Sequence, residues 1–281
     1  MANLSRKKIA ITGATGFLGK KIVKSLEKDY DLIIFSTQKF KNKKNVIYRK
    51  YSLDENFNHV FRSKELEGII HLATNYGRNN KNKAKVYLAN YKIPSKIFDA
   101  FEKSNLKYFV NTDTFYTIKN NPKLNNYISS KKKFFLKINK NKNKKKIFNL
   151  RLFHLVGRDD NENKFIPTVI RKLKKNQLIE LNNPYNYIDF IHVHDVVRAY
   201  KKILKNINLF QKKINNIDIS SGKIYSILWF VQNLKKFMNS NSRIIYSKKL
   251  PKKKFSSKGN IIKKFWKPNY SFKKIIKDLS N

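Results

Sequence analysis

The chain has 281 residues, of which 41% are hydrophobic, and it carries a formal net charge of +45. Cys is absent, which excludes disulfides, thiolate metal sites and a cysteine nucleophile. The N-terminus has no apolar run long enough for a signal peptide or a spanning helix, so we expect a soluble, cytoplasmic protein without membrane insertion.

The positive charge comes from 54 Lys and only 9 Arg, spread from end to end of the chain. Specific phosphate and base contacts favour the fork of Arg over the point charge of Lys. We therefore expect no specific nucleic-acid partner, although such a field attracts anionic cofactors and substrates. Binding of nucleic acid through the lysine surface remains a weaker alternative.

Short apolar runs alternate with helical patterns along the first half of the chain. This alternation predicts an α/β fold, a Rossmann-type doubly wound parallel sheet, and the less regular C-terminal third predicts a smaller second lobe. The predicted domains are 1–152 and 153–281, with about 188–220 returning to the first sheet. Strands are expected at 7–12, 31–36, 46–52, 66–74, 107–113 and 146–155. The less regular remainder predicts a helix and strand in 164–181, a strand running into a helix at 189–204, a strand and helix in 215–237, and a last helix after Pro268.

A glycine-rich turn, ITGATGFLGK, joins the first strand to the first helix. Glycine permits a tight turn and lets the backbone approach a pyrophosphate, while the helix N-terminus offers free N–H groups. Because the turn follows a buried strand and opens a helix, we predict that it binds a dinucleotide. The predicted cofactor-binding residues of this turn are Gly13, Thr15, Gly16, Phe17, Leu18 and Gly19.

The glycine turn, the string HLAT at 71–74 and the spacing Tyr127-x-x-x-Lys131 together resemble the extended short-chain dehydrogenase/reductase family. Within it, the chain is similar to the NAD-dependent epimerase/dehydratase group that acts on nucleotide sugars. Segments such as RLFHLVGRDD, DFIHVHDVV and WKPNYSF lie where that group has related segments, so the resemblance runs nearly end to end. It implies further cofactor contacts from Leu72, Ala73, Thr74, Tyr127 and Lys131.

The end of the second strand bears on the choice of nicotinamide cofactor. An enzyme that uses NAD usually has an acid there, which accepts a hydrogen bond from the ribose 2′-OH. This chain has Ser36 instead, and Lys39 follows. We therefore predict NADP(H), with Ser36 and Lys39 near the 2′-phosphate, and NAD(H) as the open alternative.

Tyr127 and Lys131 are spaced to share one face of a helix. Lys⁺ beside a tyrosine stabilises tyrosinate and lowers the tyrosine pKa, so that Tyr127 can exchange a proton with a carbonyl oxygen. Thr112 lies at the end of the fifth strand, where its hydroxyl can bond the same oxygen. Similar 4,6-dehydratases have Glu two residues after this Thr, and here Thr114 replaces it, which disfavours dehydration.

HLATNYGR at 71–78, the short run from NTDT to Tyr127 and RLFHLVGRDDNENKFIP resemble the CDP-abequose and CDP-paratose synthase branch. That resemblance implies NADPH-dependent reduction of a 4-keto group on a nucleotide-linked deoxysugar, in surface polysaccharide synthesis. Two alternatives remain: an NAD-dependent nucleotide-sugar 4-epimerase, and a binding protein that senses a dinucleotide. Relatives often dimerise through the helix of the Tyr-Lys pair, which implies a possible homodimer.

Substrate contacts are expected near the cofactor and in the second lobe. The candidates are Asn75, Tyr76, Arg78, Asp113, His154, Arg158 and Lys164, although 75–78 is also explained by an ordinary polar turn. The chain departs from many relatives at Ile188 and Phe153, which replace an Arg and an acid. His192 and His194 are expected on opposite faces of a strand, so we predict no metal site.

Overall fold

The computed structural model describes residues 6–52, 56–61, 66–77, 82–118, 124–141, 145–247 and 266–280. The chain divides into two compact units, one formed by 1–151 and 203–217 and the other by 152–202 and 218–281. The first boundary lies next to the predicted one. The later segment that this division assigns to the first unit is 203–217, whereas a return of about 188–220 was predicted.

Among the described residues, the main sheet contains seven strands. They are β1 Lys8–Thr12, β2 Asp31–Ser36, β3 Val46–Lys50, β4 Leu66–His71, β5 Tyr108–Thr114, β6 Lys146–Leu152 and β10 Ile214–Ile219. The helical segments of the first unit are α1 Phe17–Leu26, α2 Phe57–Val60, α3 Lys83–Tyr87, the π-helix Leu88–Lys92, α4 Ile93–Lys103, the 3₁₀ turns Phe115–Thr117 and Ile207–Leu209, and α5 Asn125–Asn139.

The strands lie in the order β10-β6-β5-β4-β1-β2-β3. Parallel pairing joins β3, β2, β1, β4 and β5 in turn. This confirms the predicted doubly wound sheet, whose order reverses between β1 and β4. In such sheets ligands bind outside the carboxyl ends of the strands at the point of reversal.

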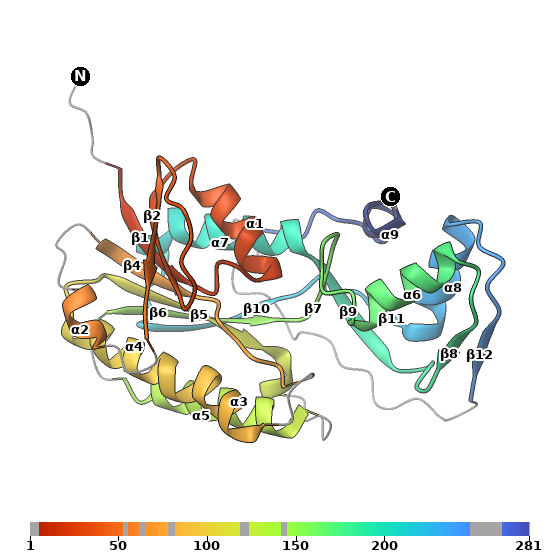
Figure 1. Ribbon diagram of the computed structural model, residues 1–281, viewed down its shortest axis with the longest axis horizontal. Coiled ribbons are helices and arrows are strands. Elements are labelled where there is room, and N and C mark those ends of the chain that lie inside the picture. Colours follow the sequence, from red (N-terminus) through yellow and green to blue (C-terminus); the bar gives the residue numbers. More distant parts are fainter. Residues whose placement is uncertain are drawn as a thin grey trace. The chain divides into compact units, whose positions relative to one another are not determined.

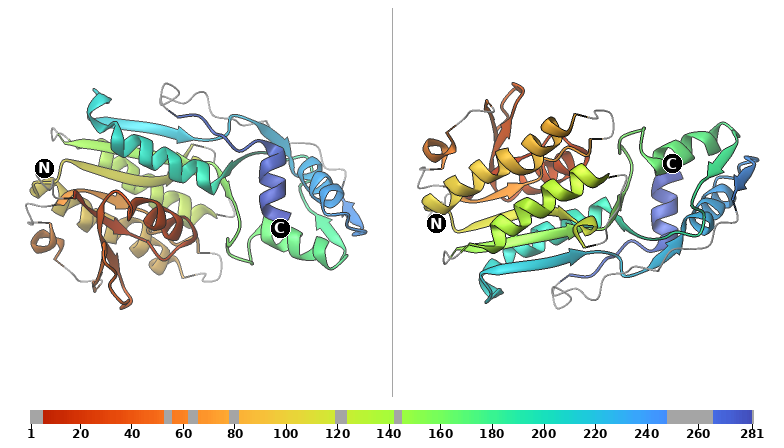
Figure 2. Two further views of the ribbon diagram at one scale, coloured as in Figure 1. Left: turned by 90° about the horizontal axis from the view of Figure 1, so that it is seen from above. Right: turned by 90° about the horizontal axis from the view of Figure 1, so that it is seen from below.

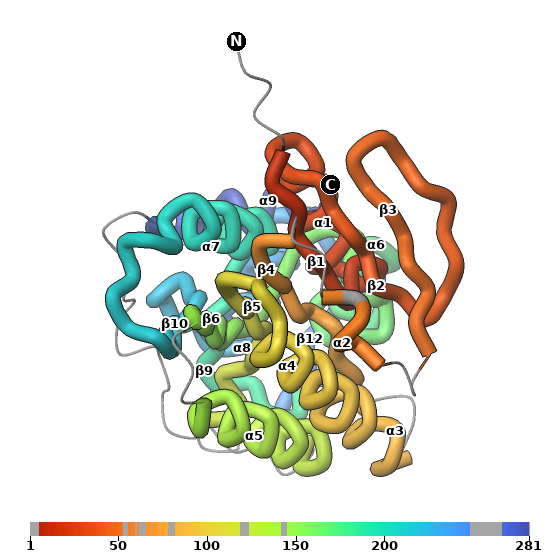
Figure 3. The backbone as a smooth tube through the Cα atoms, turned by 90° about the vertical axis from the view of Figure 1, so that its left-hand side faces the viewer, coloured from red at the N-terminus to blue at the C-terminus, as the bar shows by residue number. Residues whose placement is uncertain are grey.

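Helices cover both faces of the sheet (Figure 1), with α4 and α5 on one face and α1 on the other. Figure 3, viewed along the sheet, separates these layers clearly. The α4/α5 face is packed with aromatic rings, among them Phe98, Phe109 and Phe134, which meet edge to face. These rings are at most 1% exposed, so this side of the sheet forms a dry core.

The helical run from α3 to α4, residues 83–103, contains a π-helical turn at Leu88–Lys92. The N–H of Ile93 bonds to the carbonyl of Leu88, five residues back. Pro94 follows directly and has no N–H to donate, so the regular four-residue ladder cannot continue through it. The turn contains Asn90, which is fully buried and holds the loop after β4 by hydrogen bonds.

The second unit contains a three-stranded sheet, a two-stranded sheet and their covering helices (Figure 2). Its elements are β7 His154–Val156, α6 Phe165–Lys174, β8 Ile179–Leu181, β9 Tyr187–His192, α7 Val193–Lys205, β11 Ile224–Ser226, α8 Ile227–Phe237, β12 Ile244–Tyr246 and α9 Phe272–Ser280. The helix α7 belongs to this unit as far as Lys202, and its last residues belong to the first unit. Apolar residues of α6, α8 and α9 form its core with the strands. In the described part of the chain, no helix has the length and apolarity needed to cross a membrane.

The two histidines near the end of β9 do not alternate along one strand as expected. β9 ends at His192 and α7 begins at Val193, which brings the two rings to 5.2 Å centroid to centroid. Across the described ranges, no group of three or more His, Asp or Glu side chains is arranged to hold a metal ion.

Candidate active site

The glycine turn after β1 meets the steric conditions of a dinucleotide cradle. Gly13 has φ +72°, and a Cβ there would lie 2.4 Å from the backbone N of Ala73. A Cβ on Gly19 would lie 2.2 Å from the carbonyl oxygen of Gly13. Neither position accepts a side chain, because α1 and the loop after β4 pack directly against the turn.

Gly16 differs, since a Cβ there would come no closer than 3.4 Å to another atom. It is exposed and immediately precedes α1, whose first N–H groups lack helical acceptors. Thr15, Phe17 and Leu18 flank this open backbone. The turn therefore fits a pyrophosphate bound at a helix N-terminus, as the sequence predicted.

The end of β2 carries no carboxylate. Ser36 Oγ accepts a hydrogen bond from the N–H of Gln38 at 3.1 Å, so the hydroxyl caps a turn. Lys39 is exposed beyond it. The end of β2 thus has a hydroxyl and an exposed lysine where an enzyme that uses NAD usually has an acid.

Tyr127 and Lys131 lie on the buried face of α5, and each is 3% exposed. Lys131 Nζ donates a hydrogen bond to the backbone carbonyl of Thr112 at 2.9 Å. The Tyr127 hydroxyl is hydrogen-bonded to the side chains of Thr114 and Thr74. The structure thus gathers the predicted pair at the carboxyl ends of β4 and β5.

The sequence predicted that Thr112 acts beside Tyr127 and Lys131, and in the structure Thr112 and Thr114 each contact one member of this pair. Thr112 lies within β5 and fixes Lys131 through its carbonyl, whereas Thr114, the last residue of β5, contacts Tyr127. Alternation along a strand places Thr112 and Thr114 on one face. The two-residue spacing could therefore have indicated from the sequence that Thr114 belongs to the site. From the sequence, Thr114 was used only as an argument against dehydration.

A loop after β4 closes over the pair and is organised by Asn90. Asn90 Oδ1 accepts from Thr74 Oγ1 at 3.0 Å and from the N–H of Asn75 at 2.9 Å, while its Nδ2 donates to the Asn75 carbonyl. Asn75 Oδ1 accepts from the N–H of Gly77, so this side chain caps its own turn. Asn90 was missed from sequence, because nothing in its local pattern marks it.

Tyr76 in this loop stacks its ring 4.8 Å from that of Tyr127, and it is 39% exposed. It is therefore the accessible neighbour of a buried tyrosine. Arg78, predicted to contact the substrate, lies outside the described residues. Leu72 and Ala73, predicted to contact the cofactor, lie against the glycine turn, where the N–H of Leu72 donates to the Thr12 carbonyl.

Burial dominates the protonation of these groups. It raises the pKa of Tyr127 well above its usual range, and Tyr76 and Asp113 act in the same direction. Burial also lowers the pKa of Lys131 to about 8, which Asp113 partly opposes. The expected lowering of the Tyr127 pKa is thus not found in the protein by itself, because burial outweighs the hydrogen bonds of Thr114 and Thr74, which act in the lowering direction.

Asp113 does not face an open site, although it was predicted to contact the substrate. It is 3% exposed, and its Oδ2 accepts from Asn149 Nδ2 at 3.2 Å and from Thr117 Oγ1 at 3.3 Å. Burial raises the pKa of this carboxyl, and Lys131 lowers it.

The remaining predicted substrate residues belong to the second unit. His154 is half-buried in β7, edge-on to Phe190. Lys164 pairs with Asp160 at 2.7 Å, and Arg158 pairs with Asp278 of α9, with 3.7 Å between Nε and Oδ1. Both cations thus take part in ion pairs inside this unit, and their predicted contact with the substrate stays a prediction.

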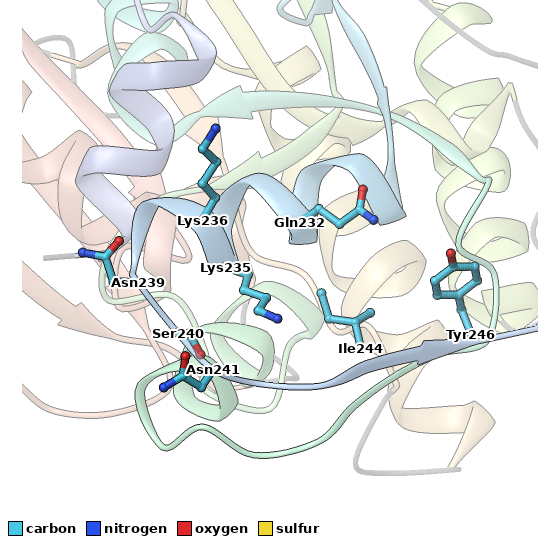
Figure 4. A pocket seen from close by; sticks show the side chains of 8 residues that line it. All are labelled: Gln232, Lys235, Lys236, Asn239, Ser240, Asn241, Ile244 and Tyr246. Carbon is cyan, nitrogen blue, oxygen red and sulfur yellow. The ribbon is translucent and has the colours of Figure 1, made fainter.

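Two pockets are lined by described residues other than the predicted site residues. One pocket of about 680 Å³ lies along α8 and β12 of the second unit, with Lys235, Asn241 and Tyr246 among its lining residues (Figure 4). Another, of about 620 Å³, lies at the amino ends of β4 and β5 and is lined by Lys7, Glu67 and other residues.

With the fold and this geometry established, comparison with known proteins decides the family. Residues 9–218 match the NAD dependent epimerase/dehydratase family. The chain belongs to this family. It is an NAD(P)-dependent oxidoreductase of the extended short-chain dehydrogenase/reductase type acting on a nucleotide sugar, and its cofactor is a nicotinamide dinucleotide.

Two characterised relatives are similar over most of their length. CDP-abequose synthase of Salmonella muenchen is 31% identical, with 85% of this chain and 84% of that protein covered. CDP-abequose synthase of Salmonella typhimurium is 29% identical, with 96% of each covered. These matches confirm the resemblance to that branch.

Solved structures share the fold at lower identity. UDP-N-acetylglucosamine 4-epimerase from Methanobrevibacter ruminantium, in complex with UDP-N-acetylmuramic acid, superimposes with a TM-score of 0.81 at 20% identity, covering 98% of this chain and 96% of that one. UDP-glucuronic acid 4-epimerase from Bacillus cereus, in complex with NAD, gives 0.78 at 16% identity, covering 96% and 94%.

Proposed function

We propose that the protein reduces the 4-keto group of a CDP-linked deoxysugar with NADPH, in the synthesis of a surface polysaccharide. The observation that carries this proposal is the similarity to two CDP-abequose synthases over most of the chain, combined with a Tyr127–Lys131 pair built into one buried face of α5. Thr114 supports reduction over dehydration, because it places a hydroxyl where elimination of water needs a carboxylate.

In the proposed reaction Tyr127 acts as the proton donor. Its raised pKa keeps the hydroxyl protonated at neutral pH, which is the state a donor needs. Hydrogen bonds with Thr114 and Thr74 orient that hydroxyl, and the Lys131 ammonium, anchored on the Thr112 carbonyl, offsets the negative charge left on Tyr127. A nicotinamide held beside Tyr127 would supply the hydride for C4, and Tyr127 would donate the proton that completes the alcohol.

The glycine turn and the end of β2 hold the cofactor in this proposal. Exposed Gly16 and the N-terminus of α1 receive the pyrophosphate. NADPH is preferred to NADH, because no acid follows β2 to accept from a ribose 2′-OH and Lys39 brings positive charge to the same turn.

Turnover of purified protein tests the proposal directly. With NADPH and a CDP-linked 4-keto-3,6-dideoxyhexose, we expect cofactor oxidation and a reduced sugar, both followed by absorbance and mass spectrometry. Tyr127→Phe should lower kcat by about 10²–10⁴-fold, because it removes the proton donor. Tyr87→Phe is the matched control, since the Tyr87 hydroxyl contacts only Lys133 among the described residues. Equal rates for Tyr127→Phe and Tyr87→Phe would contradict the mechanism.

The 4-epimerase alternative has a separate signature in the same preparation. An epimerase returns the hydride to the other face of the sugar, so it keeps its nicotinamide bound and shows no net oxidation. NAD that co-purifies, together with interconversion of a nucleotide sugar without added cofactor, would replace the reductase proposal by this one. Neither activity in any substrate combination would favour the dinucleotide-sensing protein.

A further inference from the structure

A row of buried polar side chains crosses the main sheet beneath α5. Thr12 Oγ1 pairs with His71 Nδ1 at 2.8 Å, and Asn111 Nδ2 donates to Asn149 Oδ1 at 2.7 Å. His71 and Asn111 are neighbours in the register of β4 and β5. These four residues are at most 1% exposed, and the His71 ring lies 6.0 Å from that of Phe134 in α5. Polar groups this deeply buried are costly unless they are bonded, so the row needs a physical reason.

Asp113 brings a carboxylate to this row. It follows Asn111 by two residues, so both side chains face the same side of β5. Asn149 binds both: its Oδ1 accepts from Asn111, and its Nδ2 donates to Asp113 Oδ2. Asp113 Oδ1 is buried and has no hydrogen-bond partner among the described residues. The carboxyl also has a hydrogen bond with the backbone of Thr114, but none of these donors carries a charge, and a buried carboxylate without a counter-charge is costly.

Lys131 supplies that charge. It is equally buried, and its Nζ is fixed on the carbonyl of Thr112, the residue next to Asp113. Among the described titratable groups nearby, Tyr127 on α5 is kept protonated by burial, and His71 on β4 is kept neutral because burial lowers its pKa to about 3. Asp113 is therefore the group of opposite sign that acts on Lys131.

We propose that Asp113 is a positioning residue: its carboxylate is the buried counter-charge of Lys131, held in place by Asn149 and Thr117. A role as substrate ligand does not fit, because Oδ1 is closed off and Oδ2 is bonded to the protein. The consequence for turnover rests on the proposed function, since the pair keeps Lys131 charged beside Tyr127. The pairing itself does not depend on that function.

A double-mutant cycle measures the pairing without any activity. Asp113→Asn and Lys131→Met each leave one buried charge without its counter-charge, so each should lower the melting temperature. The double variant should lose clearly less than the sum of the two losses. The control cycle uses Asp99→Asn and Lys137→Met, whose ion pair joins α4 to α5 at 2.6 Å with 48% and 29% of the side chains exposed. We expect additive losses there, and additive losses for Asp113 and Lys131 would overturn the proposal.

Lys131→Met alone provides a second measurement if Asp113→Asn does not fold. Without Lys131, Asp113 takes up a proton more readily in the folded state than in the unfolded chain. The deficit in melting temperature should therefore shrink as the pH falls from about 8 to about 5. A deficit that does not change with pH contradicts the pairing.

Kinetics then separate a positioning residue from a substrate ligand. Loss of the Asp113 charge lowers the pKa of Lys131, so the alkaline limb of kcat should move to lower pH by about one unit or more in Asp113→Asn. The KM for the sugar should not change. A raised KM with an unmoved limb would assign Asp113 to the substrate. If the unaltered protein shows no turnover, the proposed function fails while the stability cycle still decides the pairing.

Discussion

Both compact units bury carboxylates at the start or end of a strand or helix, but the partners differ. In the second unit, Asp195 is fully buried and accepts hydrogen bonds from the backbone N–H groups of Asn269 and Tyr270 and from Arg198. In the first unit, the donors to Asp113 are the side chains of Asn149 and Thr117 and the backbone of Thr114, its neighbour in the chain, and the charge of Lys131 acts on the same carboxyl. The hydrogen bonds of Asp195 thus come from the backbone segment that it holds and from Arg198. Asp113 depends on the charge of Lys131.

This difference separates two uses of buried charge. Backbone donors fix Asp195 to the segment before α9, which stabilises the fold of the second unit. A nearby ammonium makes Asp113 sensitive to protonation, which suits a site where protons move. Changes in the second unit should therefore appear mainly as lost stability, and changes in the first mainly as altered pH dependence and cofactor binding.

The largest effect is expected for Asp195→Ala. It leaves two backbone N–H groups without their acceptor and Arg198 with the Lys267 carbonyl in place of a carboxylate, which should cost about 3–5 kcal/mol of unfolding free energy. Urea denaturation measures this loss, with Asp99→Ala as a partly exposed control expected to lose at most about 1 kcal/mol. A loss for Asp195→Ala no larger than that of the control would remove the contrast between the units.

Gly19→Ala should come next, with a loss of about 1–3 kcal/mol in the free energy of unfolding, because its Cβ would press against the Gly13 carbonyl.

Gly16→Ala has room for the new methyl, so it should fold normally yet bind NADPH more weakly, because the methyl blocks the approach of the pyrophosphate. Thermal denaturation and fluorescence titration with NADPH separate the two effects. Unweakened NADPH binding by Gly16→Ala would contradict the cradle.

The pH dependence of turnover should show an alkaline limb near the Lys131 pKa of about 8. Below this value Lys131 is charged, and above it the charge is lost, so kcat should fall by about tenfold per pH unit. The sign for stability is opposite: the unfolded chain keeps this proton up to its ordinary pKa of 10.5, so the cost of burying the charge disappears as the pH rises towards 10.5. A pH profile of kcat that stays flat through this range contradicts the role of Lys131.

The smallest effect is expected for Arg158→Gln. Its ion pair with Asp278 is partly exposed, so we expect a stability loss of at most about 1 kcal/mol. If Arg158 is only a tether of α9, the KM for the nucleotide sugar should not change. A KM raised by about tenfold or more would instead support its predicted role as a substrate contact.

The features that could be predicted from the sequence depend on residues that lie close together in the chain. The glycine turn and the Tyr127–Lys131 pair were predictable, because each is a short spacing with one steric or helical meaning. The contacts of Tyr127 with Thr114 and Thr74, and the role of Asn90, were not, because they join segments from three different elements. Arg158 was given to the substrate, yet its partner Asp278 lies 120 residues later in the chain.

The sequence by itself determined the strand-helix alternation, the places where only glycine fits and the face that Tyr127 shares with Lys131. All three follow from backbone sterics and periodicity, which act over a few residues. Only the tertiary structure decided that Asp113 is buried and hydrogen-bonded to Asn149 and Thr117, and that Arg158 pairs with Asp278 of α9. Charge and hydrogen-bond partners depend on burial, and burial is set by packing between segments that are distant in the chain.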